Sequence, residues 1–134
     1  MNPLNTKSDR HILLIDEGNL LVRLYGALLR NRGYHIHEVT NLMMVRQFLA
    51  LDFNFEILIC DVRGVNEYRV RILKDMLPQI QARGTQVILI GPAEHALLHQ
   101  LPFPVIYSDD KNGYELLVNQ ILANARHSLA PAFA

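Results

Sequence analysis

Carboxylates stand directly after two apolar runs of the sequence. Asp61 follows the run Ile57–Cys60, and Asp16 and Glu17 follow the run Ile12–Ile15. Short runs rich in Ile and Leu are typical of strands that are buried on both faces of a parallel sheet. The carboxyl ends of parallel strands meet at one edge, so we expect the three acids to converge there. Such a cluster suits a hard cation such as Mg²⁺, and the alternative is three unrelated loop acids.

Five apolar runs alternate with segments whose apolar residues recur at helical spacing. This alternation predicts an α/β fold, namely a flavodoxin-like, doubly wound, five-stranded parallel sheet flanked by five helices. Right-handed crossovers then place the first, third and fourth strands in the middle of the sheet. The expected strands are 11–15, 34–39, 55–61, 86–90 and 105–107, and the expected helices are 19–31, 41–50, 67–81, 93–100 and 114–127.

Length and composition favour one domain. The 134 residues predict a domain at 11–127, a flexible arm at 1–10 and a tail at 128–134. The single cysteine, Cys60, excludes an internal disulfide, fits a cytoplasmic location and is expected to be a small buried hydrophobe. The 13 basic and 13 acidic residues are scattered, which argues against nucleic acid as a partner, and the apolar runs are too short to span a membrane.

Two motifs carry a resemblance to a known family. Ile12 to Glu17, followed by Leu20-Leu21, resembles the opening of a response-regulator receiver domain, and Ile57 to Asp61 resembles the receiver's phosphoacceptor strand. The resemblance covers roughly residues 11–126. It implies that Asp61 is the phosphoacceptor and that Asp16, Glu17 and Asp61 hold a weakly bound Mg²⁺ ion, with no organic cofactor.

Other positions depart from the family's pattern. Receivers carry Ser or Thr where this chain has Gly91, and Lys where it has Asp109; Lys111, two residues later, reaches the site only if its loop is rearranged. Gly64-Val65 replaces the family's Met-Pro, and residues 91–106 form a shorter segment than usual. Losing a hydroxyl that bonds to a charged group costs about 1.5–3 kcal/mol. The chain therefore resembles a degenerate receiver, a pseudo-receiver whose conventional switch is impaired.

Arg63 is a candidate for compensation. It lies two residues after Asp61 and can point back over the carboxylates, supplying the cation that Asp109 does not supply. The alternative is an exposed loop arginine, because long charged side chains usually stay in water. The pairs His95/His99 and His35/His37 share a face at helical and strand spacing, but a third metal ligand is not evident, so we interpret both as solvated faces.

Apolar residues crowd the segment before the fifth strand. The segment contains Leu97, Leu98, Leu101 and Phe103, and so short a segment is not expected to bury all four. Contiguous exposed apolar residues commonly mark an interface. In the alternative, they fold under the loop between Pro102 and Pro104 and complete the core. The predicted partner surface consists of Leu97, Leu98, Leu101, Phe103 and Tyr107.

Three functions follow from these residues. The first is a stand-alone atypical receiver that binds a histidine kinase, a phosphotransfer protein, a downstream effector or a second copy. The second is a working phosphoacceptor that uses Asp61 with Mg²⁺ in a phosphorelay. The third is a flavodoxin-like redox or nucleotide-binding enzyme, but the acids at Asp16 and Glu17 would repel a nucleotide phosphate. No nucleophile–base pair suggests hydrolysis, so we assign no catalytic residue and no enzymatic activity.

Overall fold

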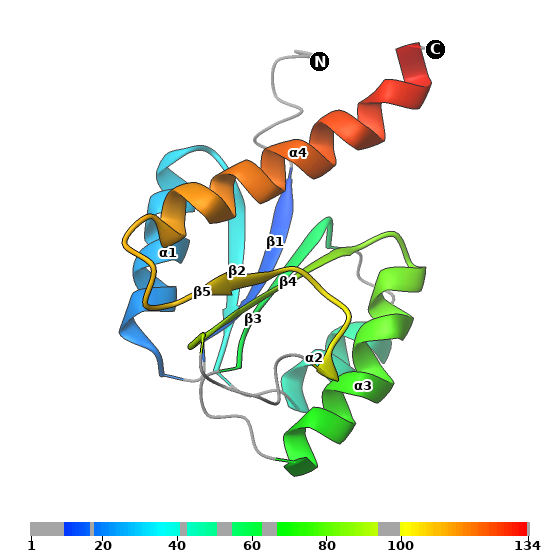
Figure 1. Cartoon of the computed structure of the whole chain (residues 1–134). Coiled ribbons are helices and arrows are strands. Elements are labelled where there is room, and N and C mark those ends of the chain that lie inside the picture. The colour runs from blue at the N-terminus through cyan, green and yellow to red at the C-terminus, as the bar shows by residue number, and fades with distance from the viewer. Residues whose placement is uncertain are drawn as a thin grey trace.

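A computed structural model describes residues 10–16, 18–40, 43–50, 55–62, 67–93 and 100–133, with the side chains at 48–49, 67–69 and 124–133 outside the description. Five parallel strands form one sheet (Figure 1). The predicted flavodoxin-like order, with the first, third and fourth strands central, is confirmed. In spatial order the strands are β2 (His35–Val39), β1 (His11–Ile15), β3 (Ile57–Asp61), β4 (Gln86–Gly91) and β5 (Val105–Tyr107).

Four helices cover the two faces of the sheet in the described part of the chain. Helices α1 (Leu20–Asn31) and α4 (Gly113–Phe133) lie on one face, and α2 (Met43–Ala50) and α3 (Glu67–Ala82) lie on the other (Figure 1). The fifth predicted helix, 93–100, falls mostly on residues 94–99, which lie outside the described residues. None of the described helices combines the length and hydropathy that a membrane span needs.

The middle residues of the central strands are apolar because both faces of these strands are covered. Leu58 and Cys60 pack on the α2/α3 side, whereas Ile57 and Ile59 pack on the α1/α4 side. Successive side chains of a strand point to opposite faces, so a strand covered on both sides needs apolar residues at every position. The prediction of a buried hydrophobic role agrees with the burial of Cys60, which is 2% exposed.

Helix α1 is rotated relative to the sequence-based expectation. Leu20 and Leu24 recur at helical spacing in the expected helix 19–31, which favours an inward position, but they are 75% and 53% exposed. The buried stripe instead runs through Val22, Tyr25 and Leu29. Gly26 is part of this stripe, and a Cβ there would lie 2.7 Å from Leu14 Cδ2. The absence of a side chain at Gly26 therefore lets this side of the helix approach β1 closely.

Two helices run further than the sequence suggested. Proline inside a helix favours a kink or a restart, but α3 runs past Pro78 as one helix from Glu67 to Ala82. Helix α4 continues to Phe133, so most of the predicted tail at 128–134 has helical backbone. Alanine and leucine, which favour helix, make up much of that stretch. Its last turns extend beyond the sheet (Figure 1).

Three histidines gather where the edge strand β2 meets β1. His11 Nδ1 lies 2.9 Å from His37 Nε2, and the His11 ring stacks on that of His35 with centroids 4.8 Å apart. Burial lowers the pKa of His37, and the nearby His11, His35 and Arg30 lower it further. The predicted edge position of this strand is confirmed, but both of its histidines contact His11 of β1 rather than forming only a solvated face.

Stability is expected to fall as the pH drops below about 6.5. Because the pKa of His37 is lowered in the folded state, the unfolded chain takes up a proton more readily. The contribution of neutral His37 is therefore complete above the unfolded pKa and is lost progressively below it. Urea unfolding of the wild type and of His37→Gln, at about pH 7.5 and about pH 5.5, measures this. A pH dependence that is unchanged in the variant would contradict the assignment to His37.

Candidate functional site

Asp16 and Asp61 lie at the same edge of the sheet. Ile15 is the register partner of Cys60 on the adjacent strand, so the two aspartates are the next residues along β1 and β3. Both are buried, with 0% and 4% of their surface exposed. Burying a carboxylate is unfavourable unless it has hydrogen-bonding or charged partners, so the partners of these acids decide what the site can do. Their proposed roles as metal ligand and phosphoacceptor stay predictions.

Both oxygens of the Asp16 carboxylate accept hydrogen bonds. The backbone N–H of Gly18 donates to Oδ1 at 2.8 Å, and Arg23 Nε donates to Oδ2 at 3.3 Å. Gly18 has φ +84°, a conformation that glycine adopts without strain, and this turn aims its N–H back at the carboxylate. The backbone N–H of Asn19 donates to the carbonyl oxygen of Asp16, and the Asn19 side chain caps α1. The start of α1 therefore holds Asp16 in place.

Other predicted residues of the site lie outside the described part. Glu17, Arg63 and the Gly64-Val65 pair are among them, so the predictions for these residues remain as they were made. Within the described residues, no three His, Cys, Asp or Glu side chains are arranged to hold a metal ion. Since Glu17 is not included in that description, the predicted three-acid cluster stays a prediction.

Gly91 and Asp109 are both described. Gly91 ends β4 beside Tyr107, and its carbonyl oxygen accepts the backbone N–H of Ser108 at 2.9 Å. Asp109 Oδ1 accepts the backbone N–H of Ala93 at 3.3 Å. The carboxylate therefore joins the loop after β5 to the loop after β4, across the two positions where the resemblance places a lysine and a hydroxyl.

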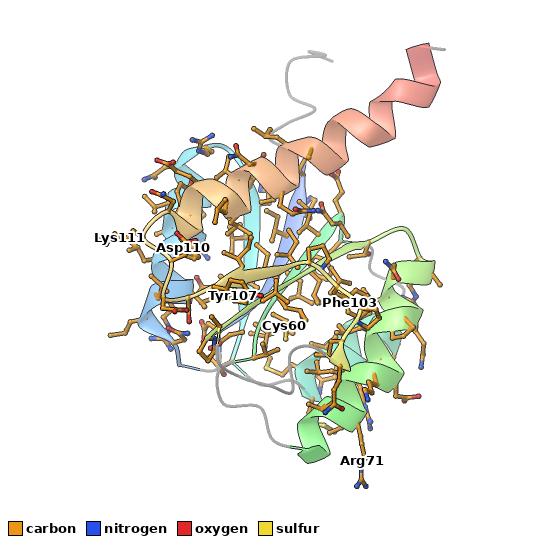
Figure 2. All side chains as sticks on the ribbon, viewed as in Figure 1. Cys60, Arg71, Phe103, Tyr107, Asp110 and Lys111 are labelled. Atoms are coloured by element: carbon orange, nitrogen blue, oxygen red, sulfur yellow. The ribbon has the colours of Figure 1, made fainter. Side chains whose placement is uncertain are left out.

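Lys111 lies on the turn between β5 and α4. The residue is exposed, and Asp110 next to it accepts the backbone N–H of Asn112 at 2.8 Å. Figure 2 places Lys111 and Asp110 at the outer side of this turn, apart from Cys60, which precedes Asp61. To reach the acids, Lys111 would need this turn to rearrange. The turn is stabilised by its own hydrogen bonds, and these would have to change.

The predicted partner surface requires a correction at two residues. Leu101 and Phe103 are 4% and 8% exposed and belong to the core cluster on the α2/α3 side of the sheet. They are buried because the segment before β5 folds back over α3 and β4, as Figure 2 shows for Phe103. Leu97 and Leu98 lie outside the described residues. Tyr107 is 37% exposed and remains available to a partner.

Arg23 was missed by the sequence-based reasoning. It follows Asp16 by seven residues and lies in the first turn of α1, from which its guanidinium reaches back to the carboxylate. Its side chain is 47% exposed, whereas that of Asp16 is 1% exposed. The available signal was the Asn19 helix cap, because a helix that begins at Leu20 directs its early side chains toward the loop that precedes it.

No family model and no curated protein matches the chain. Solved structures do match it. A response regulator receiver protein from Burkholderia phymatum is 15% identical, with a TM-score of 0.64 and coverage of 86% of this chain and 94% of that one. HP1043, an orphan response regulator of H. pylori, is 14% identical, with a TM-score of 0.61 and coverage of 87% and 97%.

A designed protein is also similar. The de novo Rossmann 2x3 fold protein r2x3_168 is 15% identical, with a TM-score of 0.58 and coverage of 86% of this chain and 90% of that one. Since a designed backbone matches nearly as well as natural receivers, the likeness concerns architecture rather than chemistry. The chain has the flavodoxin-like, five-stranded fold of response-regulator receiver domains.

Proposed function

We propose that this chain is an atypical receiver domain of two-component-type signalling, which binds a protein partner without the conventional phosphorylation switch. The observation that carries the proposal is the 3.3 Å contact between Asp109 Oδ1 and the backbone N–H of Ala93. The position where receivers have a lysine here holds a carboxylate that is bound to the neighbouring loop. Gly91 has no hydroxyl with which to meet a phosphoryl group.

Electrostatics supports the same proposal. A phosphoryl group adds about −1.5 to −2 charges. On Asp61 these charges would lie at the edge that already holds the buried Asp16 and, in the loop after β5, the carboxylate of Asp109. Arg23, which would offset part of this charge, already pairs with Asp16. A phosphoryl group therefore meets additional negative charge where a conventional receiver provides an ammonium and a hydroxyl.

The proposed partner surface is the side of the domain formed by β5 and α4. Tyr107 at the end of β5 is 37% exposed, and Leu116 near the start of α4 is 41% exposed. Aromatic side chains are enriched at protein interfaces because they bury a large area with few rotatable bonds. A histidine kinase, a phosphotransfer protein, a downstream effector or a second copy of the chain fits this role.

Incubation with a small phosphodonor and Mg²⁺ tests the proposal. We expect no stable phosphoryl mass increase on the wild type and no change in its amide spectrum. The double variant Gly91→Thr/Asp109→Lys restores a hydroxyl and an ammonium, so we expect it to retain the phosphoryl group and to respond to it. The matched control is Gly91→Thr/Asp109→Asn, which also removes the carboxylate but adds no cation.

The alternative function makes the opposite prediction. A wild-type protein that gains a phosphoryl mass, changes its amide spectrum and loses both responses in Asp61→Asn is a working phosphoacceptor. That result would overturn the proposed mechanism and favour a phosphorelay role.

A further inference from the structure

Hydrogen-bond donors meet both oxygens of the Asp16 carboxylate. Gly18 N–H and Arg23 Nε each bind one carboxylate oxygen. Asn19 Oδ1 accepts the backbone N–H of Leu21 at 3.0 Å. The side-chain oxygen of Asn19 is therefore in use, and its NH₂ group is the part that remains. Asn19 is 2% exposed, and among the described residues its Nδ2 atom has no hydrogen-bond partner. The buried side chain of Asn19 therefore offers no free oxygen at the start of α1.

This arrangement does not fit the Mg²⁺ ion that the fold family implies. Mg²⁺ needs oxygen lone pairs in a nearly octahedral arrangement. The oxygens of Asp16 already accept from Gly18 and Arg23, and the side-chain oxygen of Asn19 caps the helix. Glu17 lies outside the described residues. For Asp16, whose two oxygens both accept hydrogen bonds, a cation that donates hydrogen bonds is a better match than a metal that accepts lone pairs.

We propose that the guanidinium of Arg23 is the resident cation of this acidic edge and competes with Mg²⁺ for Asp16. A fully buried carboxylate needs a counter-charge, and Arg23 is the described cation within bonding distance of it. Arginine keeps its charge at every physiological pH and binds carboxylates more readily than lysine does. The inference rests on the proposed receiver-type site and states how that site is regulated. The chain's own Arg23 reduces the affinity of Asp16 for a metal ion.

A consequence for the charge of the site follows. With Arg23 bound, Asp16 is neutralised without a metal, so the edge keeps its conformation when Mg²⁺ is absent. A divalent ion that approaches Asp16 Oδ2 meets the positive charge of the guanidinium, so its binding is weakened while Arg23 stays in place. Removing the guanidinium frees one oxygen and leaves a buried carboxylate that needs a cation, and Mg²⁺ can then supply it.

Titration of the 134-residue chain with Mg²⁺ alone tests the inference. The measured quantities are the amide shifts of Asp16, Gly18 and Asp61 and the midpoint of thermal unfolding. We expect Arg23→Gln to show a saturable Mg²⁺ response at least about tenfold tighter than any response of the wild type. Added Mg²⁺ is also expected to raise the unfolding midpoint of this variant.

Arg30→Gln is the matched control. Arg30 lies on the same helix, is 49% exposed in its side chain and pairs with Glu38 at 3.5 Å, close to the 47% and 3.3 Å of the Arg23–Asp16 pair. We expect its Mg²⁺ response to equal that of the wild type. Arg23→Lys keeps the charge but loses the Nε–H donor, and we expect a smaller gain. It also serves if Arg23→Gln does not fold.

Equal Mg²⁺ responses in the wild type and the Arg23 variants, whether both bind or neither does, would overturn the inference. The titration contains no phosphodonor, so it is independent of the test of the proposed function. A wild type that binds Mg²⁺ as tightly as Arg23→Gln refutes the role of Arg23 and leaves the argument from Gly91 and Asp109 standing. A phosphorylated and responsive wild type refutes the proposed function whatever the outcome of the titration.

Discussion

Phe103→Ala is expected to lower the free energy of unfolding by about 3–5 kcal/mol. Phe103 is 8% exposed and packs in the core cluster on the α2/α3 side, together with Leu101 and the partly buried Val105. Truncating the ring removes buried apolar surface and leaves a cavity that the surrounding side chains fill only in part. Urea unfolding followed by far-UV circular dichroism measures the change.

Tyr107→Thr is the control from the same segment. Tyr107 is 37% exposed at the end of β5, and threonine keeps the strand preference of the position. We expect its unfolding free energy to stay within about 0.5 kcal/mol of the wild type. If Phe103→Ala instead leaves stability unchanged and weakens self-association, Phe103 belongs to a surface. That result would support the predicted partner surface.

Gly113→Ala is expected to lower the free energy of unfolding by about 1–3 kcal/mol. A Cβ at this position would lie 2.5 Å from the hydroxyl oxygen of Tyr25, which is too close for the two atoms to coexist without movement. Tyr25 is 4% exposed and its ring lies 5.7 Å from that of Tyr114, so it has little room to shift. Helix propensity alone favours alanine over glycine by about 0.5–1 kcal/mol, so the sign of the change shows which effect is larger.

Removing the hydroxyl of Tyr25 tests the mechanism directly. In the Tyr25→Phe background we expect Gly113→Ala to cost much less than it does in the wild type, because the atom that it meets is gone. The four proteins form a double-mutant cycle, and a coupling energy within the range of about 0.5–3 kcal/mol is expected for residues in contact. An equal cost in both backgrounds would show that the clash does not involve this hydroxyl.

The same hydroxyl offers a second readout. Burial raises the pKa of Tyr25, and the nearby negative charge of Asp110 raises it further. A Gly113→Ala substitution that displaces the hydroxyl toward water is expected to bring this pKa back toward its ordinary value. Spectrophotometric titration, with Tyr25→Phe to identify the signal, measures the change.

Part of the candidate site was readable from the sequence. Asp16 and Asp61 were expected at one edge because each follows an apolar run, and the β1–β3 register places them side by side in this way. The departure of Asp109 and Gly91 from the receiver pattern stays a prediction from the resemblance. The bond from Asp109 to the Ala93 N–H was not readable from the sequence, because it depends on how two loops meet at the end of the sheet.

The apolar segment before β5 illustrates a limit of composition. Leu101 and Phe103 were predicted on a partner surface because their segment is short, and that prediction is wrong for these two residues. Whether an apolar side chain is buried depends on the space that α3 and β4 leave above the sheet. That space is set by residues far away in the sequence, so counting apolar residues within the segment could not reveal it.

The sequence by itself determined the architecture of this protein. Runs such as Ile12–Ile15 and Ile57–Cys60 specify strands covered on both faces, and the short connections between strands and helices specify a parallel sheet with the observed order. These signals are local, because a strand's pattern is complete within a few residues. Only the tertiary structure decided that α1 turns Leu20 and Leu24 outward and reaches Asp16 with Arg23. The helical pattern fits more than one rotation, and the choice among them comes from the close approach of Gly26 to Leu14 and from the need of a buried carboxylate for a counter-charge.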